Sequence, residues 1–141
     1  DVALLDRVPT LRLLGTPALR MLAIGSEQRD YSSGDYLFNA GDDADAGFIV
    51  QRGAFRVEDG GAEVIAGPGA LIGELALIVA MRRPSSAVAL EHSSVIRLAR
   101  SLFQRVLESD PAAARRLRDE LAARTSQIAS DILMAGAKLN I

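Results

Sequence analysis

One stretch of the chain combines residue types that could hold a small charged ligand. Gly73-Glu74-Leu75-Ala76-Leu77 begins like a short helix, and Arg83 and Ser86 follow it closely. Backbone N–H groups at the start of a helix attract anions, and an arginine presents a planar fork of donors to phosphate oxygens. A carboxylate among such donors can accept hydrogen bonds from sugar hydroxyls. These residue types therefore predict a site for a small phosphorylated sugar.

The predicted chemistry depends on where the helix begins. If Glu74 starts it, the N–H groups of Leu75 and Ala76 lack acceptors within the helix and can face an anion. Arg83 then supplies one full positive charge, and each charged hydrogen bond contributes about 1.5–3 kcal/mol. The alternative is purely structural: Glu74 caps a helix, Arg83 is a solvated charge and Ser86 lies in a strand. Glu74 and Arg83 alone favour this structural interpretation.

The order of these residues resembles the phosphate-binding cassette of the cyclic nucleotide-binding domain family. The family pattern is Gly-Glu-(Leu/Met)-Ala-Leu, a short variable stretch, and Arg-x-Ala-(Thr/Ser)-x-x-Ala. Here Gly73-Glu74-Leu75-Ala76-Leu77 is followed, without a gap, by Arg83-Pro84-Ser85-Ser86-Ala87-Val88-Ala89. The resemblance reverses the balance and favours ligand binding.

Further motifs upstream agree with the family in order, and the resemblance covers roughly residues 8–123. They are similar to the early strands and turns of the family and read Tyr31-Ser32-Ser33-Gly34-Asp35-Tyr36-Leu37-Phe38, Gly41-Asp42-Asp43-Ala44-Asp45 and Phe48-Ile49-Val50-Gln51-Arg52-Gly53, with Val57 after them. The family includes the β-roll domains of catabolite-activator-like proteins, kinase regulatory subunits and cyclic-nucleotide-gated channels.

The resemblance implies a ligand and roles for individual residues. Glu74 is expected at the ribose 2′-hydroxyl, Arg83 at the cyclic phosphate and Ser86 as a further polar neighbour. The full expected ligand-binding set is Gly73, Glu74, Leu75, Ala76, Arg83, Ser85 and Ser86.

The family also takes a lid for the base from the helices after the barrel. Ile128, Ile132 and Met134 are candidates for stacking, and Arg124, Thr125 or Ser126 for hydrogen bonds. For each of these residues, helix packing or solvent exposure is the alternative.

Three residues depart from the family pattern. Pro84 follows the arginine and has no N–H to give to the phosphate. Arg82 stands where the family often has proline, as a solvated charge or as a second anion contact, and Ser85 replaces an alanine. A threonine directly after the arginine favours cGMP in the family, so its absence favours cAMP here, with cGMP as the alternative.

The predicted fold is mainly β, a double-stranded β-helix (jelly-roll) β-roll with flanking helices. Residues 1–25 carry apolar residues at helical intervals, and Pro9 and Pro17 cut them into short helices. Residues 26–99 alternate short apolar runs with frequent turn residues, as in a roll of short strands. Asp59-Gly60-Gly61 predicts the clearest hairpin.

The cassette occupies residues 73–89 of this roll, and helices follow it. Residues 100–135 predict two C-terminal helices, which serve as lid, dimer contact or relay, and residues 136–141 form a tail. Ser101 is expected to cap the first helix and Asp110 the second, where Pro111 takes the first helical position.

Composition narrows the functional classes. The 141 residues, 49% of them hydrophobic, suffice for one domain with its own core, and a net charge of −2 gives no general attraction to nucleic acid or anionic membrane. The lack of cysteine excludes disulfides and fits a cytoplasmic protein, or a cytoplasmic domain of a larger membrane protein. His92 is the only histidine and cannot form a multi-histidine metal site. We expect no metal, no cofactor and no catalytic residue.

These features predict a regulatory module that is not an enzyme. It would bind a cyclic nucleotide and relay binding through its C-terminal helices to an effector domain outside this fragment. Because the chain begins at Asp1 rather than methionine, we expect it to be part of a longer protein.

A second interpretation is a β-roll that has lost its ligand and acts as a dimerisation or docking domain. Such a homodimer would form through the helix carrying Leu117 and Ile132. A third is a transcription factor with a C-terminal helix-turn-helix. Too few residues follow Ala135 for such a unit, so we expect no sequence-specific nucleic-acid binding by this chain alone.

Overall fold

The computed structural model describes residues 2–59 and 61–123. The helices are α1 (Val2–Asp6), α2 (Pro9–Arg12), α3 (Thr16–Gly25) and α4 (Arg100–Ser109), and residues 111–123 are also helical. The strands are β1 (Glu27–Tyr31), β2 (Tyr36–Phe38), β3 (Asp43–Ala44), β4 (Ala46–Arg52), β5 (Phe55–Asp59), β6 (Ala62–Ala66), β7 (Leu71–Ile72), β8 (Met81–Arg82), β9 (Ala87–Ala89) and β10 (Ser93–Ala99). A short 3-10 helix, η1 (Glu74–Leu77), lies between β7 and β8.

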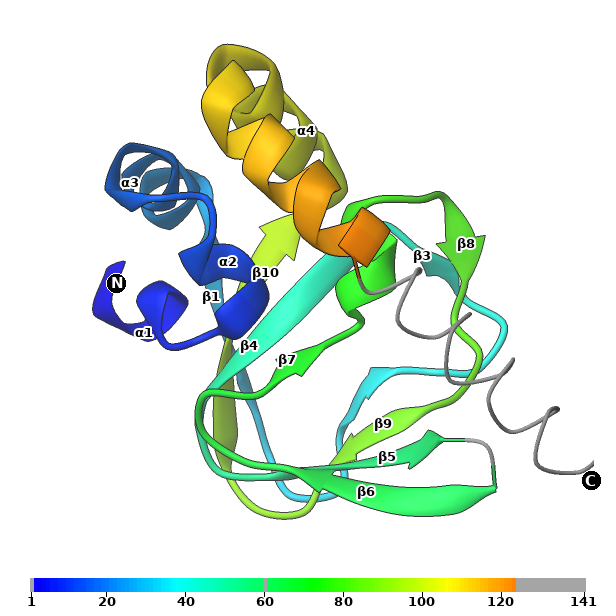
Figure 1. Cartoon of the computed structure of the whole chain (residues 1–141). Coiled ribbons are helices and arrows are strands. Elements are labelled where there is room, and N and C mark those ends of the chain that lie inside the picture. Colours follow the sequence, from blue (N-terminus) through cyan, green and yellow to red (C-terminus); the bar gives the residue numbers. More distant parts are fainter. Residues whose placement is uncertain (1, 60, 124–141) are drawn as a thin grey trace, which may run out of the picture.

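The strands form a roll of two four-stranded antiparallel sheets. One sheet has the order β1-β10-β4-β7 and the other β2-β9-β5-β6, with a small β3-β8 pair beside them. The predicted hairpin at 59–61 is confirmed, because Asp59 pairs with Ala62 and Val57 with Val64. Figure 1 shows α1 to α4 gathered at one end of the roll and this hairpin at the other. The predicted mainly-β jelly roll with flanking helices is therefore observed.

Proline determines where the short N-terminal helices begin. Pro9 and Pro17 both lie in the first turn of a helix, α2 and α3 respectively, where a missing N–H costs nothing. The apolar residues then face inward, and Leu5, Leu11 and Leu22 are fully buried.

Strand β4 separates two hydrophobic cores. Phe48 and Val50 belong to the core inside the roll. Ile49 belongs to a second core that the helices build on the outer face, together with Leu77 of η1 and Leu98 of β10. Since successive side chains of a strand point to opposite faces, β4 is buried on both sides.

The helices after the roll close the helical core. Leu117 is buried in this core, and Arg116 donates two hydrogen bonds of 2.7 Å to the carbonyl oxygens of Leu13 and Leu14. The chain itself therefore covers Leu117, which the dimer interpretation had placed at an interface. None of the described helices has both the length and the apolar character that a membrane span requires.

The two predicted caps have different outcomes. Helix α4 begins at Arg100, with Ala99 as the N-cap residue and without a side-chain cap hydrogen bond. The prediction that Ser101 caps it is wrong, because Ser101 already lies inside the first turn. The Asp110 cap is confirmed, because its Oδ1 accepts the N–H of Ala113 at 3.1 Å.

We predict that Asp110→Ala lowers the free energy of unfolding by about 1 kcal/mol, because one amide at the helix start loses its acceptor. Asp110→Asn is the matched control and should lose less, since its amide oxygen also caps. Chemical denaturation of both variants measures the difference. Equal losses would show that the cap contributes nothing.

Candidate functional site

A cavity of about 530 Å³ opens between the roll and η1. This volume is typical of a site for a small organic ligand. Its lining comes from both sheets, η1 and the segment after β8: Phe38, Val57, Glu58, Val64, Ile65, Ala66, Ala70, Leu71, Ile72, Gly73, Glu74, Leu75, Ala76, Met81, Arg83, Pro84 and Ser85.

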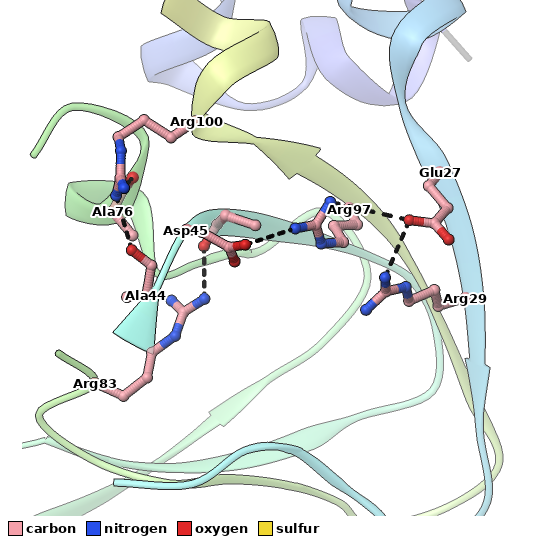
Figure 2. Close-up of polar contacts among 9 residues, drawn as sticks. Glu27, Arg29, Ala44, Asp45, Ala76, Arg83, Arg97 and Arg100 are labelled. Carbon is pink, nitrogen blue, oxygen red and sulfur yellow. Dashed lines mark hydrogen bonds and ion pairs between the residues drawn. The ribbon is translucent and has the colours of Figure 1, made fainter. Parts of the chain in front are cut away.

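Arg83 is the buried cation of this cavity. Its side chain is only 5% exposed, and Nη2 donates to the carbonyl oxygen of Ala46 at 2.8 Å. The guanidinium carbon lies 4.2 Å from the centre of the Phe38 ring and 5.5 Å from that of Phe48, so two aromatic faces support the charge. Figure 2 shows the side chain directed at the start of β4.

Within residues 2–59 and 61–123, the Arg83 charge has no carboxylate partner. None of the ion pairs in the described part of the chain involves it, and there its buried Nε also has no hydrogen-bond partner. Burial lowers the pKa of Arg83, while the carboxylate of Asp45 acts in the opposite direction. Arginine stays protonated in proteins, so the cavity contains a cation with donor capacity to spare.

Gly73 allows this cation to approach the backbone. It has a φ of 76°, a left-handed conformation that side chains rarely adopt. A Cβ at this position would lie 2.6 Å from Arg83 Nη1. Glycine is therefore required both for the turn into η1 and for the contact with the guanidinium.

The segment after Gly73 differs in part from the expected helix start. It is a single 3-10 turn, and the N–H of Ala76 donates to the carbonyl of Gly73 at 3.1 Å. The expectation that the Ala76 amide faces an anion is therefore wrong. The carboxylate of Glu74 lines the cavity and accepts a hydrogen bond from the hydroxyl of Thr10 in α2.

The residues around Arg83 divide between the cavity and its support. Pro84 and Ser85 line the cavity. Ser86 is not a lining residue, and its hydroxyl accepts the N–H of Ala40 at 2.8 Å. The exposed Arg82 also lies outside the lining and donates to the carbonyl of Gly41 at 3.2 Å.

Arg100 connects the cassette to the helix that follows the roll. As the first residue of α4, it directs Nη1 at the carbonyl oxygens of Ala44 (2.7 Å), Ala76 (3.2 Å) and Val79 (3.1 Å). Figure 2 shows this contact and, beside it, Arg97 between Asp45 and Glu27. A displacement of η1 would therefore disturb the start of α4.

Some candidates lie elsewhere. The proposed lid residues Arg124, Thr125, Ile128 and Ile132 lie outside the described residues. His92 is exposed in the turn before β10. Among the described residues, no group of three or more His, Cys, Asp and Glu side chains could hold a metal ion.

Sequence reasoning missed two kinds of contributor. Phe38, Val57 and Met81 lend apolar surface to the cavity from separate strands or their edges. Thr10 and Arg100 hold the cassette from outside it. The motif containing Tyr36-Leu37-Phe38 indicated a strand, but no local signal linked Thr10 to a residue 64 positions away.

The chain is similar to known proteins along most of its length. Residues 28–110 match the model of the cyclic nucleotide-binding domain. An uncharacterized NTE family protein of Mycobacterium tuberculosis is 32% identical over 133 residues, which are 87% of this chain and 23% of that protein. The chain thus spans a quarter or less of the length of the curated relatives it matches.

Two solved structures share the fold. The N-terminal domain of a transcriptional regulator from Streptomyces coelicolor has a TM-score of 0.82 at 27% identity and covers 94% of this chain and 95% of its own. A cyclic nucleotide-binding-like protein from Brucella abortus has a TM-score of 0.67 at 36% identity, and the match covers 77% of this chain and 97% of that protein. Together with the family match and the arrangement of Gly73, Glu74 and Arg83, these similarities mean that the chain belongs to the cyclic nucleotide-binding domain family.

Proposed function

We propose that this chain is a sensor that binds cAMP in the cavity beside Arg83 and transmits binding through its C-terminal helices. The observation that carries the proposal is the buried guanidinium, which faces an open cavity without a carboxylate partner in the described part of the chain. An isolated charge in an apolar setting is costly, and an anion that fits the cavity would offset that cost.

The distribution of polarity supports a nucleotide rather than a simple anion. Arg83 and Glu74 lie at one part of the lining, suited to a phosphate and a sugar hydroxyl respectively. Elsewhere the lining is mostly apolar, although it includes Glu58 and Ser85. Its apolar residues Val64, Ile65 and Leu75 are 48%, 59% and 56% exposed. A nucleobase has the size and the apolar faces to cover these side chains.

The preference for cAMP over cGMP rests on Pro84. It lines the cavity directly after Arg83, where it offers neither a hydroxyl nor an N–H to a guanine. The missing N–H also removes one donor for the phosphate, so the affinity depends strongly on Arg83.

The proposed relay runs through Arg100. Ligand would draw η1 and the segment at Arg83 together, and the three carbonyl contacts of Arg100 would pass this displacement to α4. The protein would then have two arrangements of η1 and α4, one with ligand and one without it. The difference in ligand affinity between them determines how far ligand shifts the equilibrium. We propose that the effector lies in another part of a longer protein, since the match covers only 23% of the mycobacterial relative.

We predict that Arg83→Met weakens cAMP binding about 30-fold or more, because the phosphate loses its buried cationic partner. The folded state should keep its stability without ligand, since methionine removes an unpaired charge from the interior. Arg82→Met is the matched control at the neighbouring exposed position and should bind like the parent. Isothermal titration calorimetry and thermal melts measure both quantities.

Equal binding by the parent and Arg83→Met would refute the assignment of the site. A parent protein whose melting temperature rises with neither cAMP, cGMP nor cyclic dinucleotides would favour the alternative of a ligand-free docking domain. Only a ligand that binds the folded state raises that temperature.

We predict that Pro84→Thr increases cGMP affinity relative to cAMP by about tenfold, the equivalent of one added hydrogen bond to the guanine. Pro84→Ala separates the effect of the hydroxyl from that of the N–H, because it restores the N–H without adding a hydroxyl. It should strengthen the binding of cAMP and cGMP equally. Competition titrations with both nucleotides give the ratios. A ratio that is the same in the Thr and Ala variants would contradict this account of selectivity.

A further inference from the structure

Thr10 is a buried polar residue in the leucine-rich helical layer, and its hydroxyl reaches the cavity lining. It belongs to the short helix α2 and is 6% exposed. The hydroxyl donates to the carboxylate of Glu74, at a sequence separation of 64 residues. Helix α2 thus contacts the carboxylate in the cavity, although Thr10 does not line the cavity itself.

We infer that Thr10 is a positioning residue, which orients the Glu74 carboxylate toward a hydroxyl of the bound sugar. Through this contact the N-terminal helices contribute to selecting ribose over deoxyribose. The inference rests on the proposed function, because it assumes that a cyclic nucleotide occupies the cavity.

The Glu74 carboxylate is suited to accept a hydrogen bond from a ligand hydroxyl, and it must be oriented to do so. It repels the phosphate that Arg83 would attract, so a sugar hydroxyl is the ligand group it can bind well. A glutamate side chain turns about several bonds, and fixing it only when ligand arrives weakens binding. A carboxylate offers about four acceptor sites, so a bond from Thr10 does not by itself prevent a bond from the sugar.

Both ends of the Thr10–Glu74 contact are firmly supported. Val8 and Leu11, which flank Thr10, are 3% and 0% exposed, and Leu77 at the far end of η1 packs into the same helical core at 1%. The donor and the acceptor are therefore held by one common core, as preorganised binding requires.

The test compares two ligands that differ by one hydroxyl. Calorimetry of the full chain with cAMP and with 2′-deoxy-cAMP is repeated for Thr10→Val, which keeps the shape but lacks the donor, and for Thr10→Ser, which keeps the donor. We expect Thr10→Val to bind cAMP roughly three- to tenfold more weakly, the cost of ordering one long side chain. It should bind 2′-deoxy-cAMP like the parent, and Thr10→Ser should restore cAMP binding.

Three results would overturn the inference while leaving the proposed function intact. They are unchanged or tighter cAMP binding by Thr10→Val, an equal loss for both ligands, and a parent that does not distinguish the two ligands. The unchanged affinity for 2′-deoxy-cAMP also reports that the variant is folded. A parent that binds neither ligand would instead refute the proposed function.

Discussion

The candidate site depends most on the burial of one guanidinium. Arg83 is almost completely enclosed, and its described support consists of a carbonyl group and two aromatic rings rather than a carboxylate. Such an arrangement stabilises a charge only in part, so the unliganded protein retains donor capacity that it does not use. The left-handed turn at Gly73 leaves room for this group, because a Cβ at Gly73 would lie 2.6 Å from Arg83 Nη1.

The cassette is also tied to the helices on two sides. Thr10 binds Glu74, the first residue of η1, and Leu77, the last residue of η1, lies in the helical core. Arg100 binds its later carbonyl oxygens from the start of α4. A change at the ligand thus has physical routes to both the N-terminal and the C-terminal helices, and each route is a contact that can be removed separately.

The sequence allowed most of the architecture to be predicted, because its signals are local. Pro9 and Pro17 lie in the first turn of a helix, which their fixed φ suits, and the turn signal after Val57 predicted the antiparallel pairing of β5 with β6. The family and the cassette could also be inferred, since their motif is short and ordered. The predictions for the Ala76 amide and the Ser101 cap were wrong, because a shift of one residue in the helix start changes the role of each residue. Residue types alone do not determine that start to within one residue. Thr10 and Phe38 could not be assigned, because only the folded chain brings them to Glu74 and Arg83.

The double burial of strand β4 has a consequence for how such a domain changes over time. Phe48 and Val50 face the roll interior, whereas Ile49 packs with the helices. Substitutions that alter the interior of the roll therefore need not disturb the helical layer on the outer face. A descendant of this fold can come to recognise a different small molecule while its helical layer stays unchanged.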